Sequence, residues 1–111
     1  MYVLSQRMRW EPLRTEVYED ISSTYTPLGT ALENPARIIK VVNTTDVTIT
    51  ISTDAINDMD VVPSGSFFLY DISTNKTEQS TLFVDQGTVF YVKGSPSSGA
   101  VYLVVIYAAS Y

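Results

Sequence analysis

A chain of 111 residues has room for one hydrophobic core, and its charged fraction of 17% is below the roughly 25% of an average globular domain. It contains neither cysteine nor histidine, which excludes disulfides, thiolate and imidazole metal sites, and Ser-His-Asp or Cys-His catalysis. The net charge of −5 is uneven: residues 1–14 carry +2 and the rest carries −7, and an acidic body argues against nucleic acid as the main partner.

Residues 1–20 show neither the alternation of a strand nor the stripe of a helix, and Pro12 interrupts them. Large apolar side chains and arginines are scattered through this segment, and a segment with this much apolar surface is not expected to remain unpacked in water. We therefore expect an extended N-terminal arm that docks on its own body or on a neighbouring protein, with its arginines against acidic surface. The predicted contact residues are Arg7, Arg9, Trp10, Leu13, Arg14, Val17 and Tyr18.

Strand signals begin near residue 23. The segment 23–32 is broken by Pro27 and Gly29, which is typical of an edge or bulged strand. Residues 37–42 are apolar and largely β-branched and predict a buried strand. Residues 47–52 alternate with period two, which places Val47, Ile49 and Ile51 on one face. Because a short polar turn separates these two strands, we predict a hairpin over 37–52.

The second half continues this pattern. A turn at 63–65 precedes predicted strands at 66–72, 81–84, 88–93 and 100–107, with turns at 73–76, 85–87 and 94–99 between them. The last strand is an unbroken apolar run whose Val, Ile and Tyr content favours strand over helix. The sequence thus predicts an all-β fold: an antiparallel β-sandwich of jelly-roll or Ig-like type with seven or eight strands over residues 21–111, preceded by the arm at 1–20.

Candidate calcium ligands gather at residues 54–60, where several carboxylate and amide oxygens lie close together in sequence. Their spacing matches no calcium-loop pattern, and Asp and Asn are the residues that turns use to cap their own backbone. A pair of carboxylates can cleave a glycoside, but a sandwich of this size has little room for a substrate cleft. We therefore predict no metal, no cofactor and no enzymatic activity.

Three stretches of this chain resemble a small family of tailed-bacteriophage virion proteins: residues 36–54, residues 62–71, and residues 86–93 with the Ser-Pro-Ser-Ser-Gly loop and apolar strand that follow. The resemblance covers roughly residues 36–107. This chain has Ala55 after Asp54, where such proteins are expected to have glycine. The resemblance implies a structural component of the particle and brings no catalytic residues.

Together these observations predict a non-enzymatic virion protein, assembled in the host cytoplasm, that decorates or stabilises the capsid through protein–protein contacts. Its expected partners are other virion proteins (major capsid, portal, neck or tail proteins) and copies of itself. Nucleic acid is not an expected partner because the body is acidic. A membrane is not an expected partner because the sequence has no run of about 18 apolar residues and no secretory leader. Two alternatives stay open: a neck or tail adaptor that anchors a fibre, and a small carbohydrate-binding sandwich whose exposed aromatics stack on sugar rings.

Overall fold

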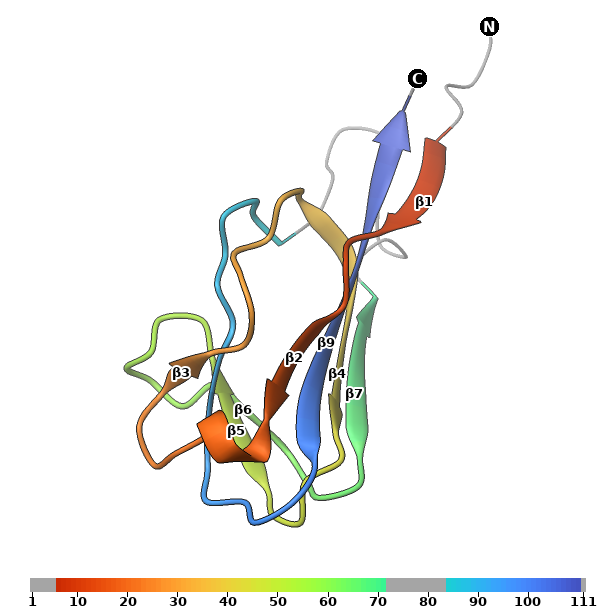
Figure 1. Ribbon diagram of the computed structural model, residues 1–111. Helices are drawn as coiled ribbons and strands as arrows, with labels where there is room; N and C mark the ends of the chain where they lie inside the picture. The colour runs from red at the N-terminus through yellow and green to blue at the C-terminus, as the bar shows by residue number, and fades with distance from the viewer. Residues whose placement is uncertain (1–5, 72–83, 111) are drawn as a thin grey trace, which may run out of the picture.

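The computed structural model describes residues 6–71 and 84–110, and within them the chain is all β apart from one short 3-10 helix. Two antiparallel sheets, of five and four strands, enclose the hydrophobic core (Figure 1). This arrangement confirms the predicted all-β class and is compatible with a β-sandwich. The predicted turn at 73–76 and most of the predicted strand at 81–84 lie outside the described residues. Val84 forms an isolated antiparallel bridge with Ala36.

The last strand, β9 (Ala100–Ser110), runs through the middle of the five-stranded sheet. On one side it pairs with β4 (Ala36–Asn43), which pairs in turn with β7 (Phe67–Asp71). On the other side it pairs with β1 (Gln6–Trp10) near its C-terminal end and with β2 (Arg14–Val17) near its start. A strand with neighbours on both sides suits the β-branched and aromatic residues that fill β9.

The four-stranded sheet is made of shorter strands. Its order is β3 (Thr26–Pro27), β8 (Tyr91–Lys93), β5 (Ile49–Ser52) and β6 (Asp60–Val62). β3 is an edge strand, as predicted, because Pro27 has no backbone N–H for a second neighbour. The predicted turn after β6 is also confirmed, with Gly65 at φ 72° and the Ser66 N–H donating to the Pro63 carbonyl over 3.1 Å. The helix η1 (Tyr18–Asp20) follows β2.

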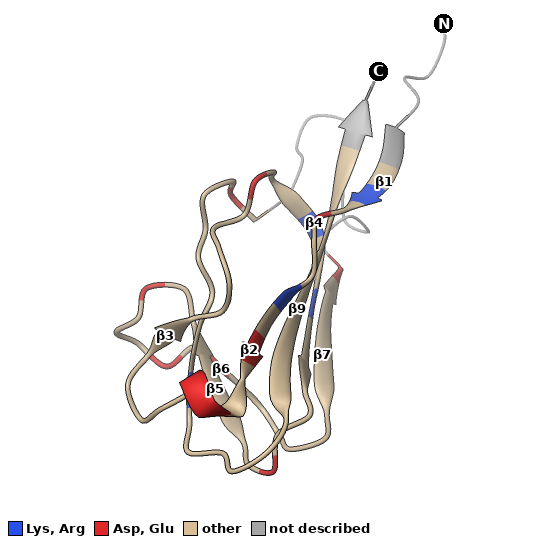
Figure 2. Ribbon diagram, in the orientation of Figure 1, with Lys and Arg blue, Asp and Glu red and all other residues tan. Residues whose placement is uncertain are grey.

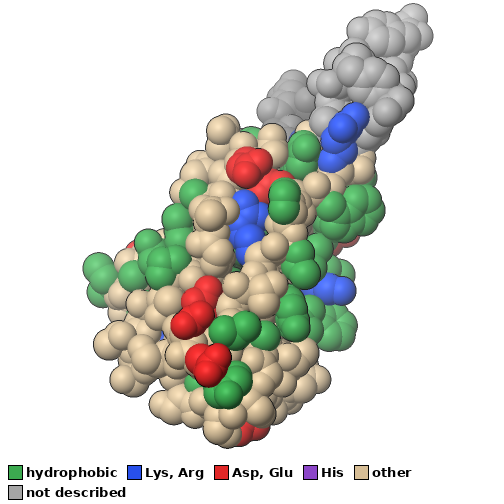
Figure 3. Space-filling model, viewed as in Figure 1, with side chains coloured by type: hydrophobic (Ala, Val, Ile, Leu, Met, Phe, Trp, Pro, Cys, Tyr) green, Lys and Arg blue, Asp and Glu red, His purple; other side chains and the backbone are tan. Residues whose placement is uncertain are grey.

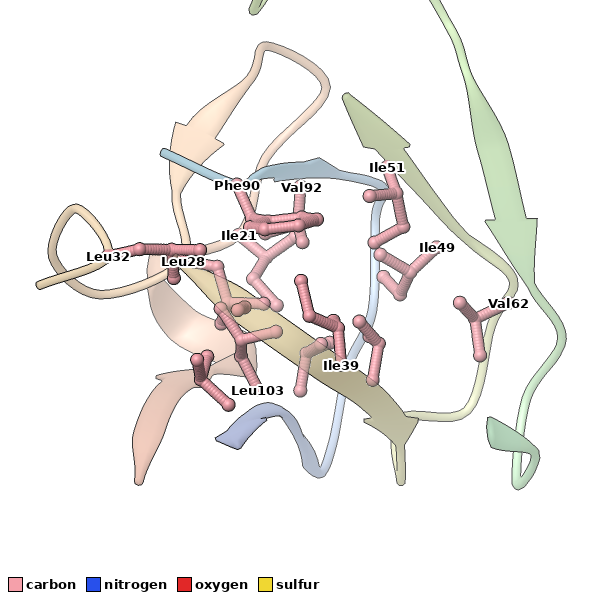
Figure 4. Packing of buried hydrophobic residues seen from close by; sticks show 14 residues of the cluster. Ile21, Leu28, Leu32, Ile39, Ile49, Ile51, Val62, Phe90, Val92 and Leu103 are labelled. Atoms are coloured by element: carbon pink, nitrogen blue, oxygen red, sulfur yellow. The ribbon is translucent and has the colours of Figure 1, made fainter. Parts of the chain in front are cut away.

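The core takes alternate residues from the two facing sheets (Figure 4). The alternation predicted for residues 47–52 is confirmed, because Ile49 and Ile51 are buried and Val47 packs against the core. Ser52, predicted on the solvent side, is buried, and its hydroxyl lies 2.8 Å from an Asp54 carboxylate oxygen. The buried residues that meet across the core include Ile39, Val41, Leu103 and Val105 from one sheet, and Ile49, Ile51, Val62 and Val92 from the other.

The predicted hairpin over 37–52 is wrong, because β4 and β5 belong to different sheets. The buried side chain of Asn43 organises the crossover between them. Its amide nitrogen donates to the Val47 and Val62 carbonyls, both at 2.8 Å, and its oxygen accepts from the backbone and hydroxyl of Thr45 at 2.8 and 2.6 Å. Residues 43–46 therefore turn the chain away from the sheet that β4 occupies.

The N-terminal segment does not stand apart from the body as an arm. Residues 6–10 and 14–17 extend the five-stranded sheet by pairing with β9 of the same chain. Glu11 continues this contact, with its N–H donating to the Val105 carbonyl over 3.0 Å. We expected this segment to dock either on its own body or on a neighbouring protein. The described residues dock on their own body. Residues 1–5 lie outside them.

Candidate functional site

β9 presents apolar side chains on both of its faces. Val101, Leu103 and Val105 are fully buried and belong to the core. The residues between them leave the sheet on the opposite side, since successive side chains of a strand point to opposite faces. These residues are apolar too: Tyr102, Val104 and Ile106. A sheet with one face in water normally places polar residues there, so the composition of this face is that of a contact surface.

Cross-strand pairing extends this surface over the neighbouring strands, because directly paired residues share one side of the sheet. The pairs Thr15–Tyr102 and Ile38–Asp71 border this surface with a hydroxyl and a carboxylate. Inside these borders lie three rows: Phe67 with Val42 and Tyr102, Leu69 with Lys40 and Val104, and Ile38 with Ile106 and Trp10. We call these nine residues the outer face. Eight of them are hydrophobic.

The outer face is open to solvent at its margins. Trp10 is 64% exposed, Phe67 62% and Leu69 53%, although such side chains usually avoid water. The ammonium group of Lys40, the one charged member, lies 5.9 Å from the centre of the Phe67 ring and makes a cation–π contact. Figure 3 shows hydrophobic side chains gathered along the right-hand side of the molecule. A contiguous apolar surface of this kind marks an interaction site.

The predicted apolar contact residues of the N-terminal segment all lie at the surface. Trp10 belongs to the outer face. Val17 is 42% exposed and follows Thr15, the partner of a residue of the outer face, by two positions, so it leaves the sheet on the same side. Leu13 and Tyr18 are 59% and 36% exposed outside the three rows. The structure thus places Trp10 and Val17 on the same side of the sheet, near opposite ends of β9, whereas Leu13 and Tyr18 are exposed just outside β2.

The three predicted arginines have different positions. Arg9 is exposed and alternates with Trp10, so its side chain leaves the sheet on the other side. Arg7 pairs through its backbone with Ala109, and its side chain lies outside the described part. Arg14, predicted to face acidic surface outside the body, is instead buried and lies 2.8 Å from the Glu11 carboxylate of its own chain. Only Arg9 therefore offers a described, exposed positive charge on this segment.

Glu11 and Arg14 form a buried clamp between the N-terminal segment and residues 30–34. The Arg14 guanidinium donates to the carbonyls of Thr30 and Ala31 at 2.8 and 2.9 Å. The Glu11 carboxylate accepts from the Glu33 N–H at 3.1 Å and the Asn34 amide at 3.0 Å. Burial opposes the charge of Glu11, but these hydrogen bonds and Arg14 outweigh it and hold the pKa of the carboxyl below its ordinary value.

Gly29 makes room for this clamp. A Cβ at Gly29 would stand 2.7 Å from the Cβ and Cγ of Arg14, and its backbone has a φ of 72°. Both features require glycine, since a side chain would collide with Arg14 and L residues are disfavoured at positive φ. A shallow depression beside the clamp is lined by Pro12, Leu13, Arg14, Thr15, Gly29, Thr30 and Glu33.

The carboxylates of residues 54–60 are used within the fold. Asp54 accepts from the N–H groups of Ile56 and Asn57, both at 2.9 Å, and these bonds lower the pKa of its carboxyl. Asp58 pairs with the Lys93 ammonium at 2.9 Å. In the described ranges, no group of three or more acidic, His or Cys side chains is arranged to hold a metal ion. Ala55 occupies the left-handed region, with φ 64°, at the position where glycine was expected.

Sequence reasoning missed most of the outer face. The signal was present, because the last strand and the Phe67–Tyr70 run are apolar at both odd and even positions, which a strand covered on one side does not need. Which half faces the core depends on the sheet that covers it, and this is a tertiary property. The missed members are Ile38, Lys40, Val42, Phe67, Leu69, Tyr102, Val104 and Ile106.

No protein-family model, curated protein or solved structure matches this chain. The candidate site therefore stands on the geometry of the chain itself. Within residues 6–71 and 84–110 the structure contains no helix with the length and hydrophobicity required to cross a bilayer.

Proposed function

We propose that this protein is a non-enzymatic structural protein of a tailed-phage virion, assembled in the host cytoplasm, that decorates or stabilises the capsid by docking its outer face on another virion protein. A sandwich of jelly-roll or Ig-like type is part of the proposal. The observation that supports it best is the outer face itself. It is an apolar sheet surface, exposed at its margins, and none of its residues belongs to the described buried cluster.

The energetics favour contact between proteins. Complete burial of a large apolar side chain contributes about 1.5–3 kcal/mol. Trp10, Phe67 and Leu69 are each more than half exposed, so a partner that covers them recovers on the order of 3 kcal/mol from these three alone. Aromatic residues at the centre of an interface are also the usual energetic hot spots. The outer face thus supplies anchors of the kind that protein interfaces use.

The composition of the outer face distinguishes a protein partner from other ligands. Nucleic acid binding needs several cations along the phosphate backbone, and Lys40 is the one basic residue in the three rows. Sugar binding combines an exposed aromatic with several polar groups, whereas Trp10 lies beside Ile106 in a row of apolar residues. An apolar sheet surface with Lys40 inside it and Asp71 at its border fits an apolar protein surface with charges of both signs at its rim.

Matched substitutions test this function in the full chain. Leu69→Asp places a charge on the outer face, and Ile56→Asp places one on a loop where the side chain is 79% exposed. The readout is co-sedimentation of each purified variant with particles of the phage that lack the protein. We expect binding to fall at least about tenfold for Leu69→Asp, which corresponds to about 1.4 kcal/mol, and to remain for Ile56→Asp. Equal binding of both variants would reject the outer face as the attachment surface.

The place in the particle follows from copy number. A capsid decoration protein should be present in many copies on DNA-filled heads, whereas a neck or tail adaptor should occur in the small number set by one ring. Quantitative mass spectrometry of purified heads and tails measures this number. Enrichment in the tail fraction at ring stoichiometry would replace the capsid assignment by the adaptor.

A further inference from the structure

The hydrophobic core of this protein is complete without its N-terminal segment. In the described part of the chain, the buried cluster begins at Ile21 and contains no residue from β1 or β2. The large apolar side chains that precede Ile21 point outward instead, with Trp10 64% and Leu13 59% exposed. Among their described side chains, residues 6–17, which we call the N-terminal segment, therefore bury Glu11 and Arg14 but no apolar side chain.

Two sets of polar contacts hold the N-terminal segment. The first is the antiparallel ladder to one edge of β9, formed by backbone groups. The second is the clamp, in which Glu11 and Arg14 satisfy backbone groups of residues 30, 31 and 33 and the Asn34 amide. The edge of β9 and the loop 29–34 thus form a groove in which the N-terminal segment lies, held by these two sets of contacts.

The connection between the segment and the body is short and exposed. It consists of η1 and residues 22–24, all at the surface, with buried Ile21 between them. Two backbone bonds close it against the body: the Tyr18 N–H donates to the Gly99 carbonyl at 3.0 Å, and the Gly94 N–H donates to the Ser22 carbonyl at 2.8 Å. A hinge within η1, before Ile21, frees the N-terminal segment and leaves every side chain of the buried cluster in place.

Charge favours an encounter between the segment of one copy and the body of another. Residues 6–17 carry +1 and residues 18–111 carry −6. Figure 2 shows basic positions on β1 and β2, and acidic positions on η1, on β2 and on loops at both ends of the molecule. Opposite charge on two surfaces accelerates their association and orients it.

We propose that the N-terminal segment is exchanged between copies of this chain: residues 6–17 of one copy occupy the groove on β9 and loop 29–34 of the next. Every backbone bond and both clamp residues keep their partners, so exchange costs little beyond opening the hinge and bringing copies together. A head-to-tail exchange of this kind closes into a ring or continues as a chain. The inference extends the assembly role proposed above and names a second copy as one partner.

Engineered cysteines test the exchange, since the native chain contains none. Thr15 pairs with Tyr102 across the groove, and directly opposed strand residues lie within disulfide range. Thr15→Cys and Tyr102→Cys are placed in separate full-length chains of different mass, co-refolded at high concentration and oxidised. Lys40→Cys and Val104→Cys, paired inside the body, form the matched control.

We expect a mixed disulfide between the Thr15→Cys and Tyr102→Cys chains several-fold above that of the control pair. A yield equal to the control overturns the exchange. The double variant with both cysteines in one chain must close its own disulfide after dilution, and failure to do so would refute the groove itself. No other virion protein is present in this experiment, so exchange can fail while attachment through the outer face stands.

Discussion

A single buried amide, Asn43, decides where the chain leaves one sheet for the other. Its side chain makes four hydrogen bonds, to Thr45, Val47 and Val62, and so ties β4 to β6 and to the turn that leads into β5. Groups of this kind are costly to remove, because the partners stay buried without a substitute.

Replacement of this amide is therefore expected to weaken the whole fold. Asn43→Ala leaves the Val47 and Val62 carbonyls without their donor and should lower the free energy of unfolding by about 3 kcal/mol. Urea denaturation followed by Trp10 fluorescence measures the change. Asn57→Ala removes an exposed amide that bonds to Asp54 and should cost less than about 1 kcal/mol. Similar losses for both variants would contradict the role assigned to Asn43.

Glu11 makes stability depend on pH in a definite direction. Its folded-state pKa is lowered, so the unfolded chain takes up protons more readily and stability is lost as pH falls through the acidic range below the ordinary Glu pKa. Glu11→Gln should reduce that acid dependence, while leaving Arg14 buried beside a neutral group and lowering stability near neutral pH by about 3 kcal/mol. Urea midpoints of both proteins between about pH 3 and pH 7 measure this.

Glu16 is the matched control with the opposite sign. Burial and the nearby charge of Asp20 raise the pKa of this carboxyl, so its protonation favours the folded state as pH falls. Glu16→Gln should therefore steepen the loss of stability in acid rather than flatten it. An unchanged acid dependence in Glu11→Gln would show that the clamp carries no net linkage.

Among the elements, the N-terminal segment contributes no side chain to the buried apolar cluster, although it pairs with β9 over most of its length. A chain that lacks residues 1–17 should still unfold cooperatively on heating, at a lower Tm. A synthetic peptide of residues 1–17 should restore part of that Tm in proportion to its concentration, as a ligand of the native state does. The same peptide with Glu11→Ala and Arg14→Ala should restore much less.

The control deletion continues through Ile21, which is 6% exposed and belongs to the core. Loss of this side chain should lower stability by a further 2–5 kcal/mol or so, and the peptide cannot replace it. If the shorter deletion already abolishes the cooperative transition, the segment is an integral part of the core fold and the groove is not a separate binding site. Circular dichroism during heating distinguishes these outcomes.

Several elements could be predicted from sequence because their signals are local. The alternation of Ile49 and Ile51 predicted the buried face of β5, and the polar turn after Pro63 was recognised from its own residues. Membership in a sheet was not local: β4 and β5 each satisfied the pattern of a strand, but nothing in the pattern said that Asn43 would send them to different sheets. The pairing of residues 6–17 also escaped, because their anchoring groups are polar and their apolar side chains face outward.

The candidate site was predictable only in part for the same reason. Trp10 was noticed because it is a large apolar residue in a segment that shows no strand alternation. The rest of the outer face is assembled by register between strands far apart in sequence, as when Leu69 reaches Val104 through Lys40. Such a surface becomes visible only when the strand order is known.

On the scale of the whole molecule, the two proposed contacts are exchange of the N-terminal segment and docking of the outer face. They differ in physical origin and should respond differently to added salt. Exchange of the N-terminal segment is assisted by the attraction between a segment of +1 and a body, residues 18–111, of −6, which ordinary salt screens over distances of about 8–10 Å. Docking of the outer face is apolar, and sulfate strengthens apolar burial because it is excluded from protein surfaces.

Sodium chloride should therefore slow the mixing of segments between copies, measured as the rate of mixed-disulfide formation between the Thr15→Cys and Tyr102→Cys chains. Arg9→Gln, which removes an exposed positive charge of the segment, should reduce this salt dependence. Sodium sulfate should instead increase co-sedimentation with particles, and Leu69→Asp should remove that increase. If chloride and sulfate change both readouts in the same direction, the two contacts are not physically distinct, because one surface would then carry both the charge and the apolar contribution.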